Sequence, residues 1–295
     1  MAPKIVNDED FPGLYKAADR ASLRSQYIYF LGLGVYLVLL VCAAIVSFAW
    51  PTSIQGAIAS ALLFLITLGI LIGLKIKKPD DIWYNGRAVA ESVKTRSWRW
   101  MMQAEPYQDN ACHEIALKQF ISDLKSILEQ NRSFAHELTS ADGVLAPISE
   151  KMLEVRHLPI SERLNVYQDQ RIQNQANWYS KKSLFNKKRA FFWFFASFVL
   201  HVVAIIMLLY RIVEPTASVP VEVVATAAGA VLTWLQAKKH SELNSSYALT
   251  AHEIVLIKSE VLSVKNEKEL SDFVINSENA FSREHTQWIA LKSAR

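Results

Sequence analysis

The sequence predicts an all-α membrane protein in which four transmembrane helices form two helical hairpins with long cytosolic helical extensions. The first observation is that four long apolar runs lie in two pairs, each joined by a short turn. The second is that basic residues gather on one side of both pairs. The third is that the other segments are polar and show helical spacing of their apolar residues. A composition of 51% hydrophobic and 20% charged residues fits a membrane protein with a large soluble part.

The first hairpin is predicted from two uncharged runs, about residues 27–50 and 54–74, with Pro51 in the turn between them. Either run can cross the membrane, because about 20 helical residues span a hydrocarbon core of roughly 30 Å. Gly69 and Gly73 have the GxxxG spacing, which lets two helices approach closely within a membrane. We therefore expect these glycines at a contact between helices.

A helix over residues 82–104 is expected after this hairpin, with Asp81 as its N-cap. Arg87 and Glu91 lie one turn apart in this helix and can form an ion pair. Apolar residues at helical spacing predict an amphipathic helix over residues 111–131. The chain then divides into a first unit (1–108), a cytosolic helical insert or linker (109–160) and a second unit (161–295).

The second hairpin is predicted to continue directly from a long polar helix. This helix begins at Ser161 and contains no glycine or proline before Pro215, so we expect it to run into the third membrane helix, at about residues 190–210. The fourth membrane helix is expected at about residues 219–235. Polar helices follow, the last of them amphipathic over residues 268–293, so the second half repeats the order of arm, hairpin and arm.

The fourth apolar run differs from the others because small side chains fill its middle and it contains an acidic residue, Glu222. Ala225 and Gly229 share one helix face, which predicts close packing against other helices or a pore-facing position. The simpler interpretation is that the small residues only help the bundle to pack. Glu222 can line a pore entrance and favour cations, or it can lie solvated at the depth of the lipid head groups.

Basic residues determine the predicted orientation of the hairpins. Clusters at residues 75–78, 187–189 and 238–239 flank one side of the membrane helices, whereas the opposite turns contain only Arg211. The positive-inside rule then places both termini in the cytoplasm. The same distribution suits contact with anionic lipid, so the lipid bilayer is the first expected partner.

The sequence predicts neither an enzyme nor a cofactor or metal site. The pair His252-Glu253 begins a zinc-binding HExxH pattern, but Leu256 occupies the position of the second histidine. The nine glycines are scattered and form no phosphate-binding loop. A net charge of +4 is too small to indicate a nucleic-acid partner.

Several stretches resemble a family of bacterial membrane proteins, the SLATT family. Residues 171–179, 225–239 and 273–288 are similar to the arm before a SLATT hairpin, its second membrane helix and its C-terminal helix. The segment after the first hairpin is similar through Arg87, Ala90, Glu91, Ser92, Lys94 and Trp98. Together these stretches resemble two tandem SLATT units that leave out only the insert at residues 109–159.

The resemblance implies a role that residue patterns alone do not indicate. SLATT proteins are two-transmembrane effectors associated with nucleotide-second-messenger synthases and their sensors. They are proposed to oligomerise and to permeabilise the bacterial inner membrane in anti-phage defence. For this chain the resemblance implies a homo-oligomer in that membrane and a cytosolic sensor or nucleotide-signalling partner, because the chain contains no recognisable nucleotide sensor. The residues expected to hold the cytosolic bundle together or to receive the signal are Arg87, Glu91, Trp98, Arg283, Glu284 and His285.

The leading hypothesis is a membrane effector that forms a pore or permeabilises the bilayer. The positions expected to pack its helices or line its pore are Gly69, Gly73, Glu222, Ala225 and Gly229. Two other functions fit the same topology. A constitutive ion channel or transporter predicts a defined permeant ion and tolerance to high expression. A non-conducting scaffold predicts that charge reversal at Arg87 or Arg283 abolishes the binding of cytosolic partners.

Overall fold

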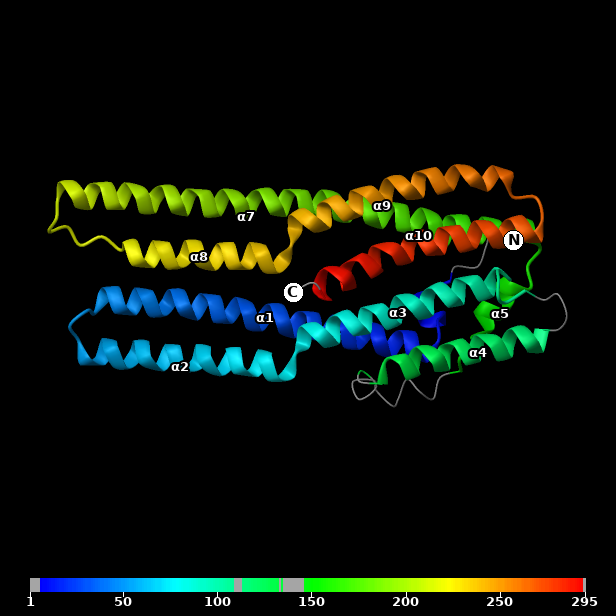
Figure 1. Ribbon diagram of the computed structural model, residues 1–295, viewed down its shortest axis with the longest axis horizontal. Helices are drawn as coiled ribbons and strands as arrows, with labels where there is room; N and C mark the ends of the chain where they lie inside the picture. Colours follow the sequence, from blue (N-terminus) through cyan, green and yellow to red (C-terminus); the bar gives the residue numbers. More distant parts are fainter. Residues whose placement is uncertain (1–5, 109–112, 133, 135–145, 294–295) are drawn as a thin grey trace. The chain divides into compact units, whose positions relative to one another are not determined.

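The computed structural model describes residues 6–108, 113–132, 134 and 146–293, with side chains as far as residue 282. All regular structure in these ranges is helical, as the sequence predicts (Figure 1). The helices form two compact units. Unit 1 comprises Met1–Ser25, Asp80–Lys182 and Ser246–Arg295, and unit 2 comprises Gln26–Pro79 and Ser183–Ser245. Each unit therefore contains segments from both halves of the chain.

The first hairpin of unit 2 consists of the apolar part of α1 (Gly13–Ala49) and of α2 (Ile54–Lys77). Ser53 caps α2, because its hydroxyl accepts a hydrogen bond from the Gly56 amide at 3.4 Å. A Cβ atom at Gly56 would lie 2.6 Å from the Cβ of Trp50, so the turn has no room for a larger residue there. A serine cap and a packed glycine thus close the predicted turn.

The second hairpin consists of the apolar part of α7 (Gln173–Val213) and of α8 (Val221–Lys238). The Trp234 ring on α8 lies 6.2 Å from the Trp193 ring on α7 and 5.9 Å from the Phe30 ring on α1. The helices of unit 2 therefore follow the spatial order α7, α8, α1, α2, which Figure 1 shows.

Three helical stretches in the described part of the chain are long and apolar enough to cross a membrane: Gly13–Ala49, Ile54–Met101 and Ile160–Val213. They contain the first three predicted spans. The fourth predicted span corresponds to α8, which does not meet this criterion. Glu222, Lys238 and a middle rich in alanine and threonine reduce the mean hydropathy of this helix of 18 residues.

Unit 1 contains the polar helices. Beside the polar ends of α1 and α7, its elements are η1 (Asp8–Asp10), α3 (Pro79–Met101), α4 (His113–Gln130), α5 (Glu150–Arg156), α6 (Ile160–Tyr167), the π-helical η4 (Gln168–Ile172), α9 (His240–Glu260), η5 (Val261–Ser263) and α10 (Glu267–Ser293). The unbroken helical path expected from Ser161 to the third span is confirmed, with η4 as a π-helical segment within it.

The helix after the first hairpin begins earlier than predicted. Asp81 is not its N-cap, because α3 begins at Pro79 and Asp81 lies in the first turn. Proline suits the first helical position, where its missing N–H would have no partner. Lys78, which precedes it, has left-handed backbone angles (φ 43°) and ends α2. The residue that ends α2, Lys78, is therefore followed directly by the first residue of α3, Pro79.

The core of unit 1 is a chain of aromatic rings that joins distant segments. The Trp98 ring on α3 lies 6.2 Å from that of Phe11 and 5.7 Å from that of Tyr167 on α6. The Tyr167 ring in turn lies 6.0 Å from that of Phe273 on α10. The apolar face predicted for α4 is confirmed in part, because Phe120, Leu124 and Ile127 are buried in this core, whereas Ile115 and Leu128 are exposed.

Candidate functional site

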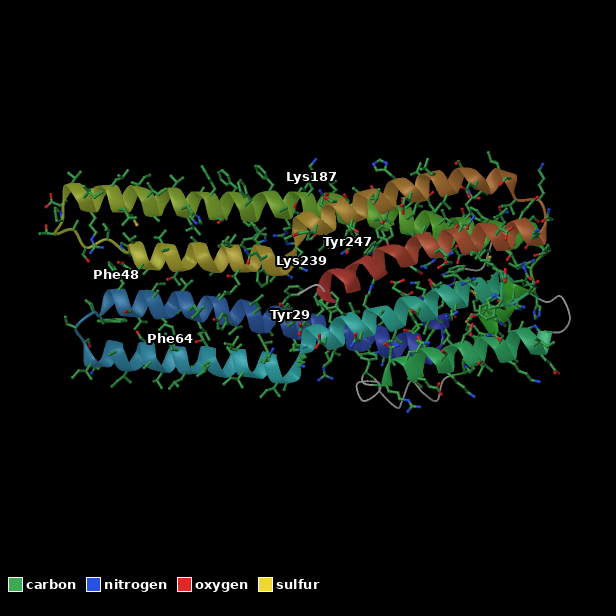
Figure 2. The ribbon with its side chains drawn as sticks, viewed as in Figure 1. Tyr29, Phe48, Phe64, Lys187, Lys239 and Tyr247 are labelled. Atoms are coloured by element: carbon green, nitrogen blue, oxygen red, sulfur yellow. The ribbon has the colours of Figure 1, made fainter. Side chains whose placement is uncertain are left out.

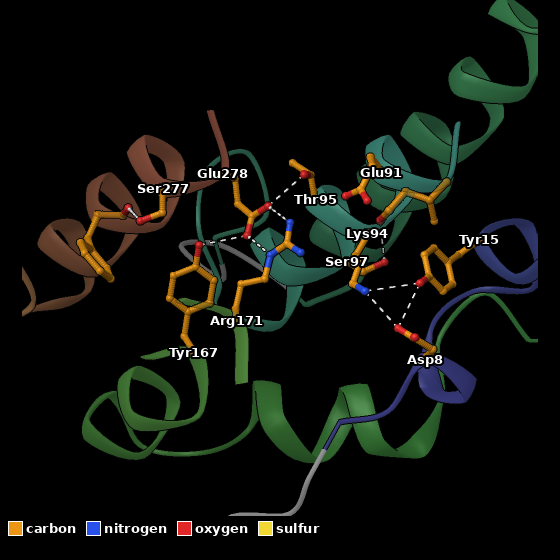
Figure 3. A network of polar contacts seen from close by, with 12 residues as sticks. Asp8, Tyr15, Glu91, Lys94, Thr95, Ser97, Tyr167, Arg171, Ser277 and Glu278 are labelled. Carbon is orange, nitrogen blue, oxygen red and sulfur yellow. Dashed lines mark hydrogen bonds and ion pairs between the residues drawn. The ribbon is translucent and has the colours of Figure 1, made fainter. Parts of the chain in front are cut away.

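The centre of unit 1 is the carboxylate of Glu278 on α10, which is fully buried (Figure 3). Arg171 donates two hydrogen bonds to it, from Nε to Oε1 at 2.9 Å and from Nη2 to Oε2 at 2.8 Å. Tyr167 donates to Oε1 at 3.0 Å, and Thr95 donates to Oε2 at 2.8 Å. Four donors from three elements therefore satisfy one buried negative charge.

Burial determines the electrostatics of this cluster. Burial raises the pKa of the Tyr167 hydroxyl, and the Glu278 carboxylate raises it further. Burial lowers the pKa of the Arg171 guanidinium, but Glu278 more than offsets that effect, so the net pKa is raised. Tyr167 therefore stays a neutral donor and Arg171 stays charged. A bidentate Arg–carboxylate pair of this kind has a defined geometry and is costly to break in a buried site.

Local helix geometry aligns the donors. Arg163, Tyr167 and Arg171 are spaced four residues apart, so they follow one face of the continuous helix through α6 and η4. Their side chains are all buried. The π-helical turn at η4 changes the register of the helix beyond Arg171.

Two further buried arginines bind the end of α3. The Arg156 guanidinium donates to the carbonyl oxygens of Trp100 and, at 2.8 Å, Tyr107. Arg163 donates to the Met102 carbonyl at 2.9 Å and forms an ion pair with Glu267. Carbonyls at a helix C-terminus have no partner within the helix and carry partial negative charge. The guanidinium groups therefore replace the missing partners and tie α5 and α6 to α3.

The N-terminal segment is attached to α3 by a second polar cluster. The Lys94 ammonium lies 3.0 Å from Asp8 Oδ1 and 3.3 Å from the Tyr15 hydroxyl, which also donates to Asp8 at 3.0 Å. The predicted pair between Arg87 and Glu91 is confirmed, with 3.0 Å between Nη2 and Oε1. Figure 3 shows this cluster around Lys94 on α3 and the Glu278 cluster, which reaches the same helix through Thr95.

The glycines selected for helix packing lie in open space as far as the structure describes the chain. A Cβ atom built on Gly69, Gly73 or Gly229 would meet no atom within 4 Å. By contrast, a Cβ atom on Gly34 of α1 would lie 3.6 Å from the Trp234 ring. The contact between the two hairpins therefore uses residues other than the glycines that the sequence pattern emphasises.

The exposed side of α8 differs from the exposed sides of α2 and α7. Large apolar side chains cover the latter two, including Leu65 and Phe195, which are more than half exposed. The exposed residues of α8 are Glu222, Ala225, Gly229, Leu232, Thr233 and Gln236. Their spacing places them on one helix face, which we call the α8 face. Most of these side chains are small or polar.

Glu222, at the start of the α8 face, has a basic neighbour. Its Oε1 lies 3.6 Å from Nη1 of Arg211 on α7. Both side chains are at least half exposed, so the pair contributes little to stability. The pair joins the two helices beside their connecting turn, where the sequence has its only basic residue on that side.

Comparison with known families explains the repeated hairpin. Residues 12–164 match the model described as SMODS and SLOG-associating 2TM effector domain 3, and residues 167–288 match the model for effector domain 1 of the same name. The chain belongs to the SLATT family. No curated protein matches it, and no solved structure does. The tandem SLATT resemblance is confirmed, and membership indicates a membrane effector.

The Glu278 cluster joins the two SLATT domains. Thr95 belongs to the first matched region, whereas Tyr167, Arg171 and Glu278 belong to the second. The first match also includes residues 109–159, which we expected to be an insert. The SLATT domains therefore share one core in unit 1.

Of the residues expected to hold the bundle or receive a signal, Arg87 and Glu91 lie on α3 and pair with each other. Trp98 is buried in the core of unit 1. The side chains of Arg283, Glu284 and His285 lie outside the described ones. Among the residues that the structure describes, no group of three or more His, Cys, Asp or Glu could hold a metal ion.

Sequence reasoning did not select Arg171 and Glu278 as site residues, although both lie in stretches that resemble SLATT proteins. The position of Glu278 in the apolar pattern of α10 could have identified it. Glu278 lies four residues after Val274 and eight after Leu270, on the apolar stripe of α10. A charged residue on such a stripe indicates a buried, paired charge, because an unpaired one is too costly to bury.

Proposed function

We propose that this SLATT protein is an effector that oligomerises through its membrane helices and forms a pore or otherwise permeabilises the bacterial inner membrane in anti-phage or related conflict defence. In this proposal α8 is the fourth span, and both termini are cytoplasmic. Its 18 residues extend about 27 Å as a helix, close to the hydrocarbon thickness of roughly 30 Å. The positions of the basic clusters support the orientation.

The observation that supports this proposal best is the character of the α8 face. Lipid tails favour large apolar side chains, as on α2 and α7, whereas small residues favour a second helix and polar residues favour water or another helix. The α8 face has Ala225 and Gly229 at its centre and Glu222 and Gln236 toward its ends. A second copy of the chain, or a water-filled pore, would suit this face better than lipid.

Unit 1 would receive the activating signal in this proposal. Its core contains residues from both SLATT domains, so a change there would reach both hairpins through α1, α3, α7 and α9, which each continue from one unit to the other. A separate cytosolic sensor or nucleotide-signalling partner would supply that change.

The test is to measure membrane potential and propidium uptake in bacteria after induced expression. Wild-type protein is compared with Gly229→Leu, which adds bulk to the α8 face, and with Val199→Leu, which adds bulk to the exposed apolar side of α7. We expect rapid depolarisation for wild type and Val199→Leu, and its loss for Gly229→Leu at equal protein level. Depolarisation that persists in Gly229→Leu would contradict a role of this face.

The same experiment separates the other two functions. A constitutive channel or transporter would change the potential by the permeation of one ion, without propidium uptake and without loss of growth. A scaffold would leave the potential intact even when the signalling partner is co-expressed, and charge reversal at Arg87 would then abolish partner binding.

A further inference from the structure

The second helix of each hairpin ends in the same unusual way. Lys78 follows α2 with φ 43° and ψ 53°, and its amide donates to the Leu74 carbonyl at 3.0 Å. Lys239 follows α8 with φ 48° and ψ 40°, and its amide donates to the Leu235 carbonyl at 3.1 Å. Glycine normally occupies such left-handed positions, because a side chain is crowded there. Both hairpins have lysine instead.

These lysines are near a larger set of basic side chains. Six of them are exposed in unit 2, and we call them the basic belt: Lys75, Lys77, Lys78, Lys187, Lys188 and Arg189. In the part of the chain that the structure describes, the side-chain ammonium groups of the five lysines of the belt have no hydrogen-bond or ion-pair partner. Two lysines of unit 1 differ in this respect, since Lys16 and Lys94 pair with Glu9 and Asp8.

The basic belt lies where the apolar surface of unit 2 ends. Figure 2 shows Lys187, Lys239 and Tyr29 at one end of the unit, and Phe48 and Phe64 farther along the hairpins. Tyrosines are typical of the boundary between membrane and water. Unit 2 has three acidic residues against the six charges of the belt. Glu214 and Glu222 lie beside the turn at the opposite end of the hairpin, where Glu222 pairs with Arg211, and Glu242 lies on α9.

We propose that the basic belt binds the phosphate groups of anionic phospholipids, with one binding region on each hairpin. An ammonium or guanidinium group forms charge-assisted hydrogen bonds with phosphate oxygens. Beside the belt, exposed apolar side chains such as Ile72 and Phe191 offer a surface for acyl chains. A free phosphate ion would leave this surface uncovered, which favours a lipid. This binding does not depend on pore formation.

The first test measures lipid binding to the purified full-length chain in neutral detergent. Phosphatidylglycerol and phosphatidylcholine are titrated, and bound lipid is counted by native mass spectrometry. We expect wild type to prefer phosphatidylglycerol at least tenfold. Each lysine near an anionic surface contributes about fivefold, so Lys75→Gln/Lys77→Gln/Lys78→Gln should weaken phosphatidylglycerol binding by well over tenfold.

A matched control removes three exposed lysines of unit 1, as Lys118→Gln/Lys125→Gln/Lys268→Gln. This variant loses the same net charge and should bind phosphatidylglycerol as wild type does. Equal loss in both variants would show a general charge effect and overturn the proposal. So would equal binding of the two lipids by wild type. Displacement of phosphatidylglycerol by millimolar inorganic phosphate would show that the ligand is a free anion, which also overturns it.

The left-handed lysines allow a second, independent test. Lys78→Gly/Lys239→Gly relieves the backbone crowding and removes two charges. We expect the thermal midpoint in neutral detergent to stay equal or rise, while phosphatidylglycerol binding falls severalfold. A reduced affinity in a protein that is at least as stable as wild type separates lipid binding from folding. Unchanged phosphatidylglycerol binding in this variant would refute the role of Lys78 in the basic belt.

Discussion

Arg171 and Glu278 form a bidentate ion pair across 107 residues of sequence, with both side chains almost fully buried. The pair links η4 to α10, and Thr95 extends it to α3. Thr95 lies in the first matched domain and Glu278 in the second. Their hydrogen bond therefore joins the two SLATT domains within unit 1.

Removing one partner of this pair should be more harmful than removing both. Glu278→Leu leaves the Arg171 charge buried without compensation, which costs about 3–5 kcal/mol. The double variant Arg171→Met/Glu278→Leu removes both charges and should recover most of that loss. Thermal unfolding of the single and double variants completes a double-mutant cycle. Additive effects of the two substitutions would contradict a coupled pair.

Replacing Arg156 by lysine should lower the stability of the protein even though the charge is kept. Arg156→Lys keeps the charge but cannot reach the carbonyl oxygens of Trp100 and Tyr107 together, because an ammonium lacks the planar fork of a guanidinium. We expect a loss of about 2 kcal/mol, as for a charge-assisted hydrogen bond. Urea unfolding measures it. Arg132→Lys, at an exposed position after α4, is the control and should change stability little.

Two glycines should respond to bulk in opposite ways. A Cβ atom at Gly86 would lie 3.0 Å from the Ala18 carbonyl oxygen and 3.0 Å from Phe134, so Gly86→Leu should lower the stability of unit 1 by about 3 kcal/mol or more. Gly229→Leu meets nothing within 4 Å and should leave the thermal midpoint of the monomer unchanged. Its effect should appear as a smaller oligomer in multi-angle light scattering. A wild-type-sized oligomer in Gly229→Leu would refute packing through this position.

Stability should fall in mild acid because of His240. Burial lowers the pKa of this histidine below 6.5, and the nearby charges of Lys238 and Arg189 lower it further. Its ring lies against Phe185, and its Nδ1 is 2.7 Å from the Asn186 amide oxygen. The unfolded chain therefore binds a proton more readily, so stability is lost as the pH falls through about 6.5 toward the folded pKa.

Thermal midpoints at about pH 7.5 and about pH 5.5 measure this effect. His240→Gln should flatten the pH dependence, whereas His252→Gln, at an exposed position of the same helix, should not. A wild-type slope in His240→Gln would assign the acid sensitivity to another group.

Much of the fold could be predicted from the sequence because its signals are local. The apolar runs determine helices α1, α2 and α7 by length and hydropathy alone. The pair of Arg87 and Glu91 follows from their spacing on one helix, since residues four apart are neighbours whatever the tertiary structure. The predicted fourth span, α8, does not meet the same criterion, because alanine and threonine lower its mean hydropathy.

The tertiary structure alone decided which charged residues pair in the core of unit 1 and which glycines lie at helix contacts. Arg171 and Glu278 are each unremarkable in a helix, and only the packing of η4 against α10 makes them partners. Conversely, Gly69, Gly73 and Gly229 match a packing motif, but an added Cβ atom at any of them would meet nothing within 4 Å in the described part of the chain. Helical periodicity is a local property that a sequence displays. The pairing of two buried charges depends on long-range packing, which repays their desolvation only when all the donors converge.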